Sequence, residues 1–283
     1  MKATPENDAF ARLILSLEPW LEHLVIIGGW AHRLYRLDPR AQQLDYEPIR
    51  TVDTDVVIPS MLQVKGADIR QRLLSNGFRE DCLGDDQPPA THYRLGGEET
   101  GFYAEFLTPL TGSEYTRQGK RNATVRIAGV VSQKLRSIEL LLKAPWILSL
   151  DQSSGFPFPQ AKQVRIANPT TFLAHKVLVY SKRPHNRFAK DILYVHDTLE
   201  TFGGRLEDLR SEWTDRIRPG LHPRSVRVIE RAWETPFGEI NDHVRQAARI
   251  AVSSGRKLSP EAILEVCSVG LKEIFGSRRT ETG

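Results

Sequence analysis

Two aspartates, Asp53 and Asp55, are the residues whose type and spacing most directly indicate chemistry. They lie in the run Arg50-Thr51-Val52-Asp53-Thr54-Asp55-Val56-Val57-Ile58-Pro59. Residues two apart in a β-strand point to the same face, so we expect the two carboxylates to project together. Adjacent anions in an apolar strand cost free energy unless a cation neutralises them. All-oxygen ligands suit Mg²⁺ or Mn²⁺ rather than zinc, although a strand edge with two solvated aspartates is the structural alternative.

A glycine turn precedes this pair. The apolar run Leu24–Ile27 predicts a short buried strand, and Gly28-Gly29 follows it directly, at the start of a predicted helix. Glycines allow backbone N–H groups to approach a ligand, and the N-terminus of a helix favours phosphate. A Gly-Gly turn by itself usually means only a tight connection. The order strand, Gly-Gly, helix and Asp-x-Asp strand is much more specific.

Residues 24–59 resemble the active-site core of the nucleotidyltransferase superfamily related to DNA polymerase β. Within that superfamily the chain looks most like the bacterial and archaeal nucleotidyltransferase-like proteins of the abortive-infection-toxin type. In these proteins a Thr-x-Asp-x-Asp run commonly follows an arginine, as in Arg50–Asp55 here. The resemblance implies an NTP substrate, Mg²⁺ (or Mn²⁺) bound by the two aspartates, and nucleotide-binding residues that include Gly28, Gly29 and Thr51.

The chain departs from compact members of this superfamily in one spacing. Gly29 and Asp53 are 24 positions apart. The excess, about Leu37 to Pro48, contains Asp38-Pro39 and Glu47-Pro48 and is interpreted as an inserted loop. Such an insertion leaves the strands intact but changes the surroundings of the nucleotide pocket.

A third carboxylate is expected on a neighbouring strand. Glu105 interrupts an otherwise apolar strand predicted within Gly101–Pro109, at a cost in desolvation like that of the aspartates. Resembling families have a similar Glu-Phe-Leu strand at this place. The resemblance implies that Glu105 binds the metal or helps to accept the proton of an attacking hydroxyl. An edge-strand glutamate that faces water is the alternative.

A lysine on a later predicted helix is the last candidate residue for the active site. Asn168-Pro169 predicts a helix start, and Lys176 lies on the helix that extends to about Ser181. Resembling families share a lysine-bearing helix followed by a Lys-Asp pair, here Lys190-Asp191. The resemblance implies that Lys176 neutralises triphosphate charge and that Asp191 orients Lys176 or the nucleotide. A helix-to-helix salt bridge between Lys176 and Asp191 is the alternative.

The order of elements predicts an α+β fold in two domains. Residues 1–167 are expected to form a nucleotidyltransferase-like catalytic domain, with a small mixed β-sheet and flanking helices. Residues 168–283 are expected to form a C-terminal helical bundle that completes the active-site cleft. Apolar spacing near 3.6 predicts its later helices over Leu206–Ile217, Ser225–Trp233, Glu239–Ser253 and Pro260–Phe275.

The composition of the chain argues against disulfide-rich, membrane-spanning and secreted proteins. With 283 residues, 40% hydrophobic and 26% charged, the chain resembles a soluble globular protein, and its two cysteines lie too far apart for a disulfide framework. No apolar run reaches membrane-spanning length, and the first residues lack the apolar stretch of a signal peptide, so we expect a cytoplasmic protein. The formal charge of +4 is compatible with an RNA partner and equally with a solvated basic surface.

These observations predict a metal-dependent nucleotidyltransferase. It would transfer NMP from an NTP to a hydroxyl acceptor, which the resemblance allows to be an RNA 3′ end, a protein or a small molecule. A catalytically silent fold that binds nucleotide or a protein antitoxin, in a toxin–antitoxin system, is the alternative. A metal-dependent nuclease ranks third, because it needs similar carboxylates but no Gly-Gly helix start.

Overall fold

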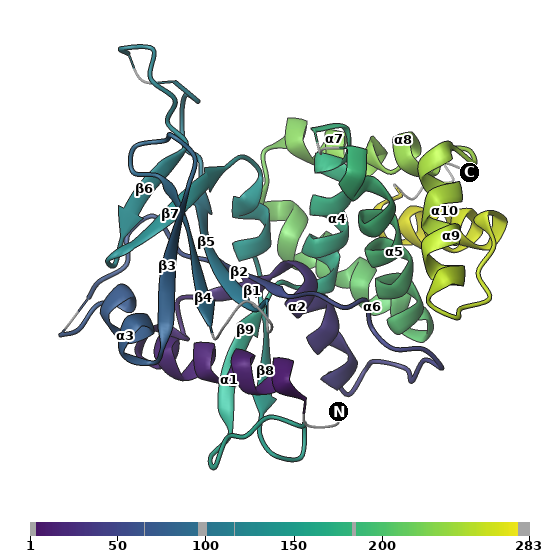
Figure 1. Ribbon diagram of the computed structural model, residues 1–283. Helices are drawn as coiled ribbons and strands as arrows, with labels where there is room; N and C mark the ends of the chain where they lie inside the picture. Colours follow the sequence, from purple (N-terminus) through teal and green to yellow (C-terminus); the bar gives the residue numbers. More distant parts are fainter. Residues whose placement is uncertain (1–3, 65, 96–100, 116, 183–184, 277–283) are drawn as a thin grey trace. The chain divides into compact units, whose positions relative to one another are not determined.

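The computed structural model describes residues 4–64, 66–95, 101–115, 117–182 and 185–276 (Figure 1). The chain forms two compact units. The first comprises Met1–Leu37 and Arg50–Ala167, and the second comprises Asp38–Ile49 and Asn168–Gly283. The segment Asp38–Ile49 therefore interrupts the first unit in sequence while its contacts belong to the second.

A mixed sheet is the centre of the first unit. Its nine strands, as far as the chain is described, follow the order β3-β4-β5-β2-β1-β9-β8, with β7 beside β5 and β6 beside β7. The pairs β2–β5, β1–β9 and β5–β7 are parallel, and the others are antiparallel. The strands are β1 (Val25–Ile27), β2 (Asp53–Val57), β3 (Phe78–Leu83), β4 (Ala90–Leu95), β5 (Tyr103–Pro109), β6 (Thr124–Ile127), β7 (Val130–Leu135), β8 (Trp146–Leu150) and β9 (Lys162–Ile166).

Strands β2 and β5 have one apolar face and one polar face. In β2 the side chains of Thr54 and Val56 are fully buried, whereas Asp53 and Asp55 are half-buried. Strand β5 alternates in the same way over Tyr103–Phe106. Because successive residues point to opposite faces, one side of this part of the sheet packs into the core and the other presents polar groups.

In the described residues of the first unit the α-helices are α1 (Pro5–Leu17), α2 (Gly28–Leu34) and α3 (Ile69–Ser75). Helix α1 begins after Thr4, whose hydroxyl accepts a hydrogen bond of 3.2 Å from the backbone N–H of Asn7. Its Phe10 ring is fully buried and stacks on Trp30 of α2, with ring centroids 4.1 Å apart. Helix α1 was not among the elements predicted from the sequence, whereas the helix that starts at Gly28 was.

The second unit is helical. In the described residues its α-helices are α4 (Pro169–Val179), α5 (His185–Thr201), α6 (Leu206–Ser211), α7 (Pro223–Ala232), α8 (Glu234–Phe237), α9 (Asp242–Ser253) and α10 (Pro260–Phe275). Helix α5 packs against α4, α9 and α10 (Figure 1). None of the described helices has both the length and the apolar character needed to cross a membrane. The predicted α+β class, with a mixed sheet, flanking helices and C-terminal helices, is confirmed.

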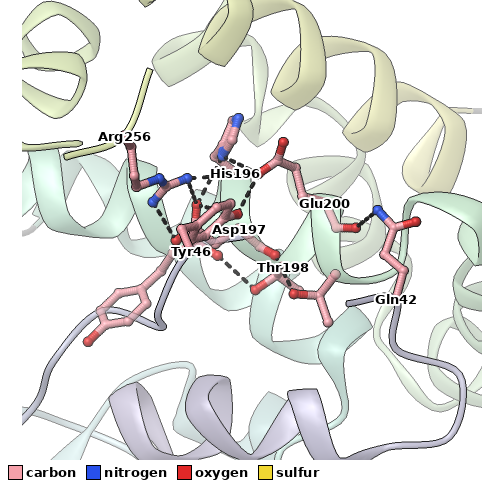
Figure 2. Close-up of polar contacts among 9 residues, drawn as sticks. Gln42, Tyr46, His196, Asp197, Thr198, Glu200 and Arg256 are labelled. Carbon is pink, nitrogen blue, oxygen red and sulfur yellow. Dashed lines mark hydrogen bonds and ion pairs between the residues drawn. The ribbon is translucent and has the colours of Figure 1, made fainter. Parts of the chain in front are cut away.

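The segment Asp38–Ile49, called the strap below, is fastened to the C-terminal end of α5. The backbone N–H of Gln42 donates to the carbonyl oxygen of Thr201 at 2.9 Å, and its side-chain amide donates to the carbonyl oxygen of Glu200. The Tyr46 hydroxyl donates to Asp197 at 3.2 Å and also to the Glu200 carboxylate (Figure 2). The region interpreted as an inserted loop is thus held by specific hydrogen bonds.

A buried ion pair lies under the strap. Both terminal nitrogens of the Arg256 guanidinium donate to Asp197, at 2.9 and 2.6 Å, and the Asp197 side chain is fully buried (Figure 2). The guanidinium carbon also lies 3.6 Å from the centroid of the Tyr46 ring. Burial and then the charge of Asp197 raise the pKa of Tyr46 well above its ordinary value, so its hydroxyl remains a donor. The strap is therefore attached through a desolvated network rather than through surface contacts.

We expect Arg256→Leu to lower the free energy of unfolding by about 3–5 kcal/mol, because it leaves the buried Asp197 carboxylate without its cation. Arg249→Leu is the matched control, since Arg249 is exposed on neighbouring α9. Chemical denaturation followed by circular dichroism measures both variants. If the free energy of unfolding fell by the same small amount in both variants, the ion pair would not have the stabilising role that we expect.

Candidate metal and nucleotide site

Register brings the three predicted carboxylates to one face of the sheet. In the parallel pair β2–β5, Asp55 lies directly opposite Glu105, and Asp53 lies opposite Tyr103. Adjacent strands are about 4.8 Å apart, so Asp55 and Glu105 are immediate neighbours across the strands. Asp53, two residues before Asp55, shares their face. Two strands that are far apart in sequence thus contribute to one acidic surface.

The glycine turn lies against this surface. Ile27, the last residue of β1, is the register partner of Asp55, and Gly28 follows with a φ of +65°. A Cβ atom built on Gly28 would be 2.3 Å from Oδ2 of Asp55. Only a glycine permits this approach, because a side chain would collide with the carboxylate in addition to the strain of positive φ.

Thr51 contacts the first aspartate. Its side-chain hydroxyl donates to Oδ1 of Asp53, and the residue is 3% exposed. The hydroxyl therefore orients Asp53, as outer residues commonly do for ligating carboxylates. The direct contact with nucleotide that the resemblance implies for Thr51 stays a prediction.

Glu105 is held by two side chains from neighbouring strands. His92 of β4, its register partner, places Nε2 2.8 Å from Oε1 of Glu105. Gln133 of β7 donates a longer hydrogen bond, of 3.4 Å, to Oε2. The His92 ring stacks on Tyr103, with centroids 4.4 Å apart and an interplanar angle of 16°. His92 was not among the predicted site residues, because only the pairing of β4 with β5 brings it to Glu105.

The donor set fits a hard divalent cation. Three carboxylates on one face, beside a turn that only glycine can form, offer the oxygen ligands that Mg²⁺ and Mn²⁺ prefer. Among the described residues, however, the carboxylate oxygens of Asp53, Asp55 and Glu105 do not form a group within 4.8 Å of one another. Binding one cation by all three residues therefore requires rotation of at least one side chain.

In the described parts of the chain, the group of acidic or histidine side chains that does meet this distance is His196, Asp197 and Glu200. These residues are the anchor of the strap. His196 Nδ1 is 3.0 Å from Oδ1 of Asp197, and both Asp197 oxygens already accept from Arg256. A metal ion here would displace these contacts and face the guanidinium charge, so the group is better explained as a structural network.

Lys176 and Asp191 are brought together in the second unit. Nζ of Lys176 on α4 lies 2.5 Å from Oδ1 of Asp191 on α5, and both side chains are less than one-tenth exposed. Nζ is also 4.9 Å from the centroid of the Tyr194 ring. The helix-to-helix salt bridge considered as the alternative is thus present. A buried pair of this kind does not exclude a role at the triphosphate, which stays a prediction.

One family of known proteins matches most of this chain. A family model described as "Nucleotidyltransferase" matches residues 7–217. No curated protein matches the chain. Among solved structures, the chain is similar to an antigenic nucleotidyltransferase-like protein from Paracoccidioides brasiliensis. The two are 15% identical, with coverage of 70% of this chain and 77% of that chain and a TM-score of 0.33. The family match extends over most of the chain and includes both aspartates, the glycine turn and Glu105, and the chain belongs to this nucleotidyltransferase family.

Proposed function

We propose that this protein is a metal-dependent nucleotidyltransferase that transfers NMP from an NTP to a hydroxyl acceptor. The observation that carries the proposal is the register of β2 with β5, which aligns Asp53, Asp55 and Glu105 beside the Gly28 turn. Family membership supports nucleotidyl transfer in general. The carboxylate chemistry supports Mg²⁺ or Mn²⁺ as the cofactor.

The three carboxylates would have different roles in the reaction. Asp53 and Asp55 would hold the cation, which, when bound, neutralises triphosphate charge and polarises the α-phosphate. Glu105 would complete the metal site or accept the proton of the acceptor hydroxyl. The acceptor oxygen forms a bond to the α-phosphorus, the bond to the bridging oxygen breaks, and pyrophosphate leaves.

The remaining residues would bind and orient the nucleotide. Backbone N–H groups of Gly28 and Gly29 would contact phosphate, and Thr51 would hold Asp53 in the orientation that it has here. Lys176, itself held by Asp191, would add positive charge for the triphosphate. The acceptor would be an RNA 3′ end, a protein or a small molecule, and the basic composition supports RNA.

One observation favours a second candidate, a silent fold that binds nucleotide or a protein partner without transfer. Glu105 is engaged by His92 and Gln133, and the three carboxylates do not converge within 4.8 Å in this conformation. In that case the same face of the sheet would bind nucleotide without catalysing nucleotidyl transfer. The two candidates differ in whether label moves from the NTP to an acceptor.

We expect Asp53→Asn and Asp55→Asn each to reduce label transfer by about 100-fold or more, because losing a metal ligand removes several kcal/mol of transition-state stabilisation. The assay incubates the protein with each α-labelled NTP, Mg²⁺ or Mn²⁺, and total cellular RNA or protein. Asp85→Asn is the control, since it removes the same charge from an exposed residue of the first unit. Nucleotide binding without transfer, across metals and acceptors, would favour the silent fold.

We also expect Gly28→Ala to impair metal binding and transfer by about 10- to 100-fold, because the new methyl group displaces the Asp55 carboxylate. Gly66→Ala is a matched control: Gly66 also has a positive φ, of +80°, but nothing lies within 4 Å of the position that a Cβ would take. Both variants carry backbone strain of about 1–2 kcal/mol. Titration with Mn²⁺ distinguishes the collision with Asp55 from the backbone strain, because only Gly28→Ala should weaken Mn²⁺ binding. Equal Mn²⁺ affinities of the two variants would show that the close approach of Gly28 to Asp55 is unimportant.

A further inference from the structure

His92 has no part in the proposed chemistry so far, yet it contacts one of the three carboxylates directly. It lies on β4 opposite Glu105, with Nε2 2.8 Å from Oε1, and the two side chains are 15% and 19% exposed. A hydrogen bond between a partly desolvated imidazole and a carboxylate is stronger than one at an open surface. This contact is therefore a strong constraint on where the Glu105 carboxylate lies.

The surroundings of the ring determine which nitrogen carries the proton. Nδ1 of His92 is buried and has no hydrogen-bond partner among the described residues. A proton on Nδ1 alone would leave a buried N–H unsatisfied and would also leave Nε2 without a proton to donate to the carboxylate. We therefore assign the neutral ring the Nε2–H tautomer, in which His92 donates to Glu105.

Packing also fixes the plane of the ring. His92 stacks on Tyr103, the register partner of Asp53, and Arg94 places its guanidinium carbon 5.4 Å from the centroid of Tyr103. Asp81 of β3 in turn accepts from Arg94 at 2.8 Å. These layers restrict the rotation of the imidazole, so its donor is already directed at Oε1 of Glu105 before any ligand binds.

We propose that His92 is a positioning residue that holds the Glu105 carboxylate in one fixed orientation through the Nε2–H donor. The proposal rests on the proposed function, because it assigns Glu105 a part in binding metal or accepting a proton. Outer donors of this kind hold ligating carboxylates in one orientation, and their loss commonly costs about 10- to 100-fold in activity or metal affinity. Gln133, at 3.4 Å, is too distant from Glu105 to replace this donor.

Two substitutions separate the hydrogen bond from the stacking. His92→Phe keeps an aromatic ring over Tyr103 but removes the donor, whereas His92→Gln keeps an N–H donor of similar reach but removes the ring. We expect His92→Phe to lower kcat for label transfer by about 10- to 100-fold with little change in KM for NTP. We expect His92→Gln to retain a rate much closer to that of the unmodified protein.

The opposite ranking, with His92→Phe active and His92→Gln impaired, would show that His92 only packs against Tyr103 and would overturn the proposal. Equal activity of both variants and the unmodified protein would also overturn it. Thermal melting of each full-length variant verifies that the comparison is made on folded protein.

Mn²⁺ affinity, measured by electron paramagnetic resonance, keeps this test separate from that of the proposed function. If the unmodified protein transfers no label, the proposed transfer activity fails, but metal binding still decides the role of His92. Weaker Mn²⁺ binding in His92→Phe than in His92→Gln would support positioning through the donor. Equal affinities, or no Mn²⁺ binding by the unmodified protein, would overturn it.

Discussion

The parallel pairing of β2 with β5 is the constraint on which the candidate site depends. Its register places Asp55 beside Glu105, and the apolar alternate residues of both strands hold that register by packing into the core. A shift of one residue would bury the acidic side chains and expose the apolar ones, at a large cost in free energy. The core of the first unit thus fixes which face carries the carboxylates.

This acidic face is supported by several elements. Thr51 donates to Asp53, the Gly28 turn leaves room for Asp55, and His92 donates to Glu105. Each carboxylate consequently has its own support from outside the β2–β5 pair. Each support restricts the orientation of one carboxylate, and binding one cation by all three would still require rotation of at least one side chain.

The sequence predicted the parts of this arrangement that are local. Strand alternation predicted that Asp53 and Asp55 share a face, and an acidic residue in an apolar strand identified Glu105 as the candidate third carboxylate. The contact between His92 and Glu105 was not predictable in this way, because it depends on which strands become neighbours. Helix α1 has ordinary start signals, Thr4 followed by a proline, and these local signals could have identified it.

The strap shows a second limit of local reasoning. Its prolines and length predicted an insertion, but not that Tyr46 would lie over Arg256 or contact Asp197. Those partners are far from Tyr46 along the chain, so no local pattern relates them to the strap. The result is that a segment within the sequence of the first unit is held by a buried ion pair of the second.

Diffraction from crystals grown with Mn²⁺ and a non-hydrolysable NTP tests the central claim most directly. We predict an anomalous peak about 2.0–2.2 Å from carboxylate oxygens of both Asp53 and Asp55, with triphosphate oxygens completing the coordination. A peak at His196, Asp197 and Glu200 instead, or nucleotide bound away from the two aspartates, would contradict this claim.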